Sequence, residues 1–409
     1  MNIFRKIKRT GNAQPSRRHI TTLLLGTALL LGTGGASAQA VEKTITAIFT
    51  PSILDPTNNR FVNTTPKEGY CPGCDVAILI GVGGNFKDIN IDAEPRRSVY
   101  IKIPSEKRQI LVSHEDGAST ALVEWRATAF SSKLNANGVL NNFDSAWLYA
   151  RGGCGNSGLI RGHAHQVEFR WLFREAAVNG CYKIAASRDF PDIRASMMAI
   201  GYELKTPNPL GMKSGIYRGS ISLSVGPGGD FDFGDNFIAT ASEITLKFEL
   251  TVKHSFKVEF SSYHPTVSLN PVGGWHQWTD YGRAPSRLQQ ELPFALTSSS
   301  DFSVKMRCEH ESEGRCGIKD QSAGTIAPVD VDVTMPGMRD LTSGAYAVNA
   351  PLIAEHSGST APRFRPDGYL ENRPSKIRFS ASGSSLDEML KAPGSSWQGD
   401  VTVIFDSDP

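Results

Sequence analysis

Short runs of alternating apolar and polar residues dominate the chain after about residue 40. In residues 244–252 and 401–405 nearly every second side chain is apolar, which is the period of a β-strand with one buried face. β-Branched and aromatic residues fill these runs, and Gly, Pro, Asn and Asp separate them. Strands are predicted at residues 44–49, 75–80, 99–103, 110–113, 122–127, 166–171, 220–225, 244–252, 256–260, 329–333, 376–380 and 401–405.

Helical patterns are scarce. Only residues 386–390 and parts of residues 172–178 suggest helical turns. No stretch supports a strand–helix–strand unit, which argues against Rossmann-type and barrel enzymes. The 39 Gly and 23 Pro lie between the strand runs, as expected of a chain with many turns. The sequence therefore predicts an all-β fold.

A short internal repeat is the most informative feature of the sequence. Residues 217–225 align without gaps on residues 397–405, at a constant offset of 180 residues. Each copy has an aromatic residue two positions before a Gly, followed by three alternating apolar side chains. The repeat predicts two β-sandwiches of one immunoglobulin-like architecture, with domains at residues 41–252 and 256–409 and a linker at residues 253–255.

The two copies differ in the segments that come after them. A Gly-rich loop, residues 226–234, and a further strand at residues 244–252 come after the first copy, whereas only residues 406–409 come after the second. The C-terminal sandwich is therefore expected to be incomplete and to be completed by a donor strand from another protein. Alternatively, residues 346–350 close the sheet. The groove of the incomplete sandwich is predicted to be lined by Phe256, Val258, Phe260, Val401, Val403 and Phe405.

Composition limits the class of protein. The 409 residues carry 43 Lys and Arg against 41 Asp and Glu, a formal net charge of +2, and 40% of them are hydrophobic. This balance offers no polybasic field for nucleic acid, and the apolar content is too high for a disordered chain. Two medium domains fit this length better than one core.

The first 38 residues are predicted to be a signal peptide. Basic residues from Arg5 to Arg18 precede an apolar stretch at residues 20–31, and small residues follow it. This order is typical of a secretory signal, with cleavage after Ala38 or after Ala40. No later run approaches the roughly 20 apolar residues of a membrane helix. We therefore expect an exported, soluble mature protein.

Six cysteines suit an oxidising compartment, in which disulfides persist. Fifteen connectivities are possible, and pairing between sequence neighbours is the preferred one. The expected bridges join Cys71 to Cys74, Cys154 to Cys181, and Cys308 to Cys316.

Other constellations favour structural roles over chemistry. His163 and His165 lie near Glu168 but lack a convincing third metal ligand, so a solvated loop or strand edge is expected. Asp230, Asp232 and Asp235 imitate part of a calcium loop, but Gly234 occupies a ligand position, so a hairpin loop is expected. The sequence predicts no metal, no cofactor and no enzymatic activity.

Several of these features together resemble a known group of proteins. They are the exported two-domain layout, the Gly-x-Tyr-x-Gly strand at residues 215–219, the Gly273-Gly274 turn, the Thr334-Met335-Pro336 triplet and the terminal strand at residues 397–405. The chain is similar to tip subunits of alternate chaperone–usher pili, a group that comprises the minor adhesins of class 5 enterotoxigenic colonisation fimbriae and the cable-pilus biogenesis initiator. The resemblance implies an adhesin domain followed by a pilin domain. It also implies four partners, namely a major pilin, a periplasmic chaperone, an outer-membrane usher and a host-cell glycan or protein receptor, and a location at the fimbrial tip.

The chain departs from this group at the receptor site. The family's intestinal adhesins use arginines, including an adjacent pair in the loop that corresponds here to residues 226–234, which contain no arginine. Near the first adhesin-domain cysteine, where the family has another arginine, this chain has Lys67, with Arg60 farther upstream. Trp275 and Trp278 could form a sugar-stacking surface or pack against a neighbouring sheet. The predicted receptor contacts are therefore Arg60, Lys67, Trp275 and Trp278.

Two function classes remain open, with a third more remote. The first is a tip adhesin that initiates the pilus, and the second is a minor pilin that initiates assembly without binding a receptor. The third is a secreted β-sandwich hydrolase or carbohydrate-binding accessory protein.

Overall fold

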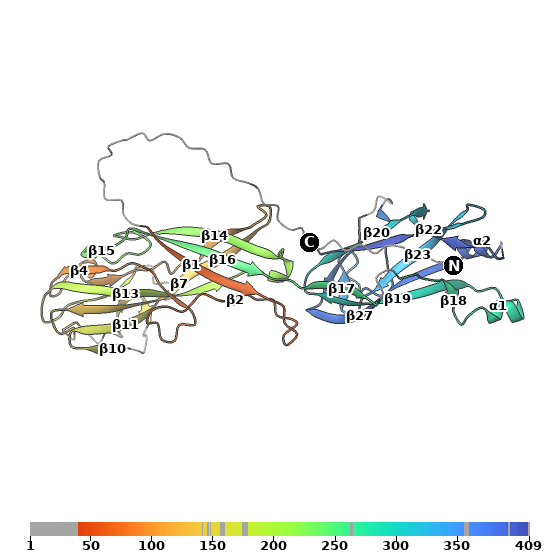
Figure 1. Cartoon of the computed structure of the whole chain (residues 1–409). Coiled ribbons are helices and arrows are strands. Elements are labelled where there is room, and N and C mark those ends of the chain that lie inside the picture. The colour runs from red at the N-terminus through yellow and green to blue at the C-terminus, as the bar shows by residue number, and fades with distance from the viewer. Residues whose placement is uncertain are drawn as a thin grey trace, which may run out of the picture.

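The computed structural model describes residues 40–407, except 141, 145–146, 148, 156–159, 174–178, 262–264, 356–359 and 392. The predicted signal peptide, residues 1–38, lies outside the described residues. Strands dominate the chain, and they gather in two units that lie end to end (Figure 1). We call the part from β1 to β16 the first unit and the part from β17 to β29 the second unit. The all-β, two-domain prediction is confirmed.

The first unit is built on one large curled sheet, in the strand order β15-β4-β13-β7-β6-β14-β16-β1-β2, with β3, β9, β10 and β11 paired beside this path. A small sheet, β5-β12-β8, lies next to it. The strands of the first unit are β1 (Ala40–Phe49), β2 (Val62–Asn63), β3 (Ala77–Leu79), β4 (Gly84–Ile89), β5 (Val99–Ile101), β6 (Arg108–His114), β7 (Thr120–Ala136), β8 (Arg151–Gly152), β9 (Cys154–Gly155), β10 (Ile160–His163), β11 (Gln166–Phe173), β12 (Cys181–Lys183), β13 (Phe190–Lys205), β14 (Gly215–Ser224), β15 (Phe237–Ala239) and β16 (Glu243–Val252).

Strand β16 is the centre of one half of this sheet. It pairs antiparallel with β14 along its whole length and parallel with β1 on its other side. Its inward residues, among them Leu246, Phe248 and Leu250, are almost fully buried because the alternation of the sequence places them on the core face.

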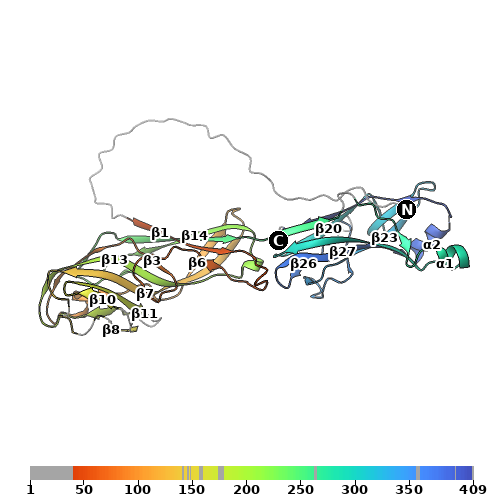
Figure 2. The same ribbon diagram turned by 60° about the horizontal axis from the view of Figure 1, so that its bottom comes forward.

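The second unit has two sheets, ordered β17-β19-β27-β23-β22-β21 and β24-β26-β20-β29. Figure 2 shows this unit after a turn of 60°, with β26 labelled together with β20 and β27. Its strands are β17 (Phe256–Phe260), β18 (Asn270–Pro271), β19 (Arg287–Ser298), β20 (Phe302–Cys308), β21 (His310–Ser312), β22 (Arg315–Asp320), β23 (Ile326–Thr334), β24 (Met338–Asp340), β25 (Ala350–Pro351), β26 (Arg363–Pro366), β27 (Leu370–Ser382), β28 (Trp397–Gln398) and β29 (Val401–Asp406).

The second unit has the strand order of an immunoglobulin domain. Such domains place strands A, B, E and D in one sheet and strands C, F and G in the other. In chain order, β17, β19, β20, β23, β27 and β29 take the places of A to F, because β17-β19-β27-β23 is the order A-B-E-D and β20-β29 is the pair C-F.

Each unit has its own hydrophobic core. The buried core residues of the first unit run from Ile45 to Val252, and those of the second from Val267 to Val403. Trp125, Trp171 and Phe130 are among the largest fully buried side chains of the first core. The predicted boundaries at residues 41–252 and 256–409 follow this division of the cores and remain predictions about independent folding.

Helices are short in the part of the chain that the structure describes. The predicted turn at residues 386–390 belongs to α2 (Ser384–Leu390), whereas α1 (His276–Tyr281) was not predicted. In the other predicted helical stretch, Leu172 and Phe173 belong to β11, and residues 174–178 lie outside the described residues. Two single 3₁₀ turns cover Pro95–Arg97 and Pro209–Gly211. None of the described helices has the length and apolar content that a membrane crossing requires.

Three disulfides join neighbours in the sequence. They link Cys71 to Cys74, Cys154 to Cys181, and Cys308 to Cys316. All six cysteines are therefore bonded, and none of the bridges joins the two units.

Candidate functional site

The repeated segment lies in β14 of the first unit and is divided between β28 and β29 in the second. In the first copy, Tyr217 is buried, and its hydroxyl accepts a hydrogen bond of 2.9 Å from the backbone N–H of Lys213. Strand β14 takes the place of strand F in the first unit, because it lies between β6 and β16 as strand F lies between C and G. The contact back to the preceding backbone is the arrangement of a tyrosine corner at the start of that strand. In the second copy, Trp397 is buried likewise, and its Nε1 donates to the hydroxyl of Ser395 at 2.8 Å. The aromatic residue of the repeat is therefore buried and hydrogen-bonded in both units, within β14 in the first and in β28, ahead of β29, in the second.

The glycine of the repeat lets another strand come close. A Cβ placed on Gly219 would lie 2.3 Å from the carbonyl oxygen of Leu111, and one on Gly399 would lie 2.8 Å from that of Gly317. Real Cβ atoms do not approach a backbone oxygen so closely, so a larger residue would force the strands apart.

The neighbours of the two F strands differ. Strand β14 lies between β6 and β16. Strand β29 pairs with β20 along its length, and no strand of the described residues pairs with it on the other side. The second unit thus has, in its described part, no counterpart of the strand that completes the first. We call the open edge of β29, together with β17, the strand gap.

Aromatic side chains line this strand gap. Phe294 of β19 contacts Phe260 of β17 on one side and Phe405 of β29 on the other, with ring centroids 5.3 and 5.5 Å apart. Phe302 of β20 contacts Phe256 and Phe405 in the same way, at 5.0 and 6.2 Å. Strands β17 and β29 therefore both contact the same two aromatic side chains, Phe294 and Phe302.

Burial along the strand gap is uneven. Phe256, Val258, Phe260 and Phe405 are only partly buried, although they pack against the core. Val401 and Val403 are 3% and 2% exposed, because they point inward between the two sheets. In the first unit, by contrast, Ile45, Ala47 and Phe49 of the opening strand are all at most 2% exposed. The open part of the predicted groove is thus its β17 side and the Phe405 end of β29.

The alternative closing segment, residues 346–350, does not fill this gap. Tyr346 forms an isolated bridge with Arg339, and β25, which begins at Ala350, pairs with β23. Strand β23 belongs to the sheet of β17 and occupies its strand D position, so this segment extends the far side of the unit.

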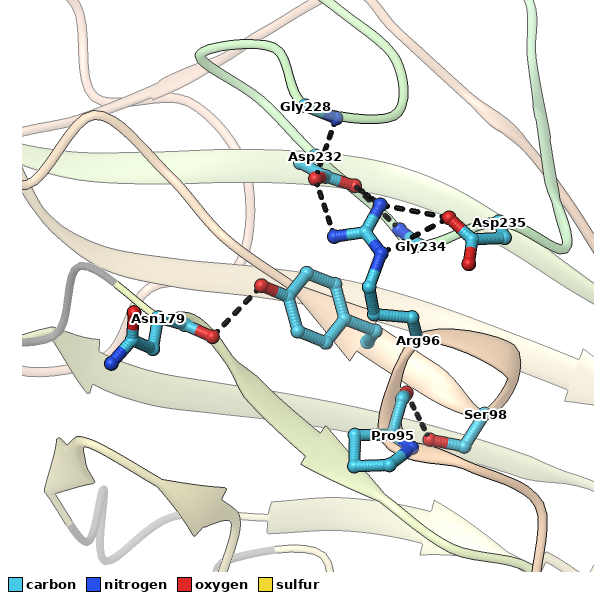
Figure 3. A network of polar contacts seen from close by, with 9 residues as sticks. Pro95, Arg96, Ser98, Asn179, Gly228, Asp232, Gly234 and Asp235 are labelled. Atoms are coloured by element: carbon cyan, nitrogen blue, oxygen red, sulfur yellow. Dashed lines mark hydrogen bonds and ion pairs between the residues drawn. The ribbon is translucent and has the colours of Figure 1, made fainter.

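The loop after β14 contains no arginine, but two arginines reach it from elsewhere. Arg96 donates to both oxygens of the almost fully buried Asp232, at 2.8 and 3.2 Å, and to Asp235 at 2.8 Å (Figure 3). Arg108 pairs with Asp230. The sequence did not reveal these partners because they lie more than 100 residues away along the chain.

These pairs neutralise the loop. Burial acts to raise the pKa of Asp232, but Arg96 and the N–H groups of Gly228 and Gly234 outweigh it and lower the pKa below its usual value. The balance is the same for Asp230, whose pKa is lowered by Ser224 and Arg108 against the effect of burial. The loop is thus a braced hairpin, as expected, and its arginines are engaged with its own carboxylates.

The predicted receptor residues do not meet in one place. Arg60 lies exposed in the segment between β1 and β2, and the Lys67 ammonium donates to the carbonyl of Cys74, both in the first unit. Trp275 precedes α1, and Trp278 lies within it, at the end of the second unit far from the first (Figure 1). Trp275 is 40% exposed, and its Nε1 donates to Asn270 at 3.3 Å. These residues thus form no single receptor surface.

His254 of the linker contacts both units at the joint between them. Its ring packs edge-on against Phe49 of the first unit at 5.6 Å, and Nε2 lies 2.9 Å from the carbonyl oxygen of Met212. On the other side, Nδ1 lies 3.1 Å from the hydroxyl of Ser299 in the second unit. Burial lowers the pKa of His254, against the Met212 and Pro209 carbonyls and Asp301, which favour the protonated ring.

No group of three or more His, Cys, Asp or Glu side chains suited to a metal ion occurs among the described residues. His163 lies in β10 and Glu168 lies in the neighbouring strand β11.

Comparisons with known proteins give matches among solved structures alone. No family model matches the chain, and no curated protein matches it. Among solved structures, the chain is similar to a chain of the CsuC–CsuE chaperone–tip adhesion subunit pre-assembly complex from archaic chaperone–usher Csu pili of Acinetobacter baumannii. The identity is 9%, the match covers 90% of this chain and 98% of the other, and the TM-score is 0.20. At that TM-score the fold is assigned from the strand order of the two units and not from the likeness.

Proposed function

We propose that this chain is an exported tip subunit of a chaperone–usher pilus, whose second unit accepts a strand from another subunit. The strand gap carries the proposal: β16 lies beside β14 in the first unit, whereas no described strand pairs with β29 on the edge away from β20. An open strand edge presents unpaired backbone N–H and C=O groups, which an extended segment of another chain can satisfy.

The partly buried aromatic side chains determine which kind of strand can fill the strand gap. Phe256, Phe260 and Phe405 leave apolar surface open beside Phe294 and Phe302. A strand that carries an apolar residue at every second position would bury this surface while pairing with β29. A periplasmic chaperone would supply such a strand first, and the N-terminal extension of the major pilin would replace it after passage through the outer-membrane usher.

The first unit supports the proposed tip position. Strand β1 starts at Ala40 and pairs with β16 over residues 40–49. Because residues 40–49 pair with β16, β1 is committed to the sheet of its own unit and is not the strand that this subunit would donate. Such a subunit accepts a strand but gives none, so it begins the pilus and presents its first unit outward as an adhesin.

The test uses the full chain, exported with an affinity tag in a host that carries the pilus genes. The expected result is a second protein at about one copy per chain, identified by mass spectrometry as a chaperone or pilin. A control chain with a donor peptide appended after Pro409 should recover no such partner, because the peptide fills the gap. If the strand gap were closed within the chain, the parent would purify alone as a stable monomer, and the proposal would be wrong.

A non-adhesive initiator is the second candidate. It would share the strand gap and the tip position, and would differ only in lacking a ligand for the first unit. A receptor screen with the full chain separates the two.

A further inference from the structure

A row of mostly polar side chains crosses the outer face of the large sheet in the first unit. Directly opposite residues of an antiparallel sheet point to the same face, and the strand register places six of them in line. Figure 1 shows the strands concerned at the end of the first unit away from the joint. The row runs through His163 of β10, Gln166 of β11, Asn135 of β7, Arg194 of β13, Asn85 of β4 and Ile238 of β15.

This row faces solvent. The residues next to it in the strands, Leu134, Ile193 and Phe86, are at most 1% exposed and point into the core. Because strand side chains alternate, the members of the row point away from the core, and all of them are exposed or half-buried. The row is therefore an accessible surface of the folded unit.

Three members of the row have no polar partner. Among the described residues, none forms a hydrogen bond or ion pair with the side chain of Asn135, Gln166 or Arg194. Their neighbours are paired: Asn85 donates to Asp192 at 2.7 Å, and Lys133 lies 4.0 Å from Glu168. Two amides and one guanidinium thus lie in line with their hydrogen-bonding capacity unused by the protein.

A hollow of about 580 Å³ opens over one end of this row. Asn85, Arg194 and Ser196 line it from the sheet, and the glycine-rich segment 81–84 and Thr240 line it from the side. A β-bulge after Ser196 turns Met197 outward, at a φ of 50° and 50% exposed. The volume lies within the range of roughly 300–1,000 Å³ that is usual for ligand sites.

The chemistry of this surface specifies its ligand. A guanidinium presents paired N–H donors that match a carboxylate, and amide side chains both donate and accept, as sugar hydroxyls require. Four cations, Lys87, Lys133, Arg161 and Arg194, lie on this face against the two carboxylates Asp192 and Glu168, so the surface is cationic. Strands about 4.8 Å apart also space successive side chains close to the repeat of a sugar chain.

We propose that this face binds a carboxylate-bearing oligosaccharide. Arg194 holds the carboxylate in the hollow, Met197 and Ile238 contact the apolar face of the sugar, and Asn135 and Gln166 bind the following units along the row. The inference deepens the adhesive part of the proposed function and rests on it, and it places the ligand away from the loop after β14.

The experiment is titration calorimetry on the full chain with hexagalacturonate and a hyaluronan hexasaccharide, and with chitohexaose as a neutral probe. We expect the acidic probes to bind and chitohexaose to bind much more weakly. Arg194→Gln should weaken acidic binding roughly 10- to 100-fold, the loss typical of a hydrogen bond to a charged group. A combined Asn135→Ala and Gln166→Ala variant should weaken it as well.

Arg363→Gln is the matched control, because Arg363 is an exposed strand arginine of the second unit whose side chain also has no polar partner among the described residues. It should leave binding unchanged, and melting curves establish that every variant is folded. Failure of both acidic probes to bind, equal affinity for chitohexaose, or unchanged binding by Arg194→Gln would each overturn the inference. The recovery of a chaperone or pilin tests the strand gap of the second unit, whereas the sugar titration tests the outer face of the first unit. Either experiment can therefore fail without the other.

Discussion

The ring of Phe405, in the last strand of the chain, lies 5.5 Å from the ring of Phe294, centroid to centroid, in the opposite sheet. Phe260 of the first strand of the same unit also contacts Phe294, with ring centroids 5.3 Å apart. Strands A and F of the second unit therefore both contact Phe294. The strand gap lies where strand G of an immunoglobulin domain would pair with strand F. This relationship underlies the proposed function.

Amide hydrogen exchange should distinguish the two copies of the repeat. Strand β14 is paired with β16 along its length, whereas the edge of β29 that faces the strand gap has no described partner strand. Amides of residues 401–406 should exchange at least about tenfold faster than those of residues 217–224, since edge strands open more easily. Equal protection of both segments in the isolated chain would mean that β29 is already covered.

Residues 41–252 should fold without the second unit. Their core is separate, and β16 completes their sheet. The oxidised fragment is expected to be soluble and to unfold in one cooperative transition by circular dichroism. An insoluble or molten fragment, with both disulfides verified, would show that the boundary is wrong.

Removal of the Arg96 side chain should destabilise the loop after β14. In Arg96→Gln the buried Asp232 keeps the Gly228 and Gly234 N–H groups but loses its charged partner. The expected loss is roughly 1–3 kcal/mol in the free energy of unfolding, measured with urea. Arg218→Gln, which breaks an exposed pair with Glu249, is the control and should cost no more than about 1 kcal/mol. Equal losses would mean that Asp232 does not depend on Arg96.

Acid should weaken the joint through His254. Because the pKa of the buried ring is lowered, the unfolded chain takes up this proton more readily than the folded one. The stabilising contribution is thus present above the ordinary pKa of about 6.5 and is lost as the pH falls below it. The melting temperature of the parent should therefore fall more steeply between about pH 7 and pH 5 than that of His254→Gln. The exposed His276→Gln variant should follow the parent, and identical slopes for all three proteins would contradict the assignment.

The sequence predicted several strands with clear alternation, although it missed β20, in which Phe302, Val304 and Met306 also alternate. Strand β16, with apolar residues at every second position, was predicted almost to its ends. Strand β13 was not, because Ala195, Met198 and Ala199 have weak strand propensity and its bulge at Met197 breaks the period of two. The neighbours of β13 on both sides determine its conformation, which a local pattern does not reveal.

The two candidate sites also differed in whether the sequence could predict them. The strand gap could be predicted because residues 217–225 and 397–405 are copies of one repeat, and the sequence shows that the segments after the two copies differ. The row through Asn135, Gln166 and Arg194 could not, because it exists only in the register between strands distant in sequence. Helix α1 was missed as well, since its six residues include two aromatic side chains and carry no capping side chain.

The thermal stability of a strand fusion tests the central claim most directly. The N-terminal segment of a candidate major pilin is joined after Pro409 through a flexible linker, and the control carries the same segment with its apolar residues shifted by one position. That shift turns every apolar side chain to the other face of the strand. We predict a soluble monomer whose second unit melts about 10 °C or more above the parent, and a control without that gain. No gain from any pilin segment would mean that the second unit is already complete, and would contradict the role of the strand gap.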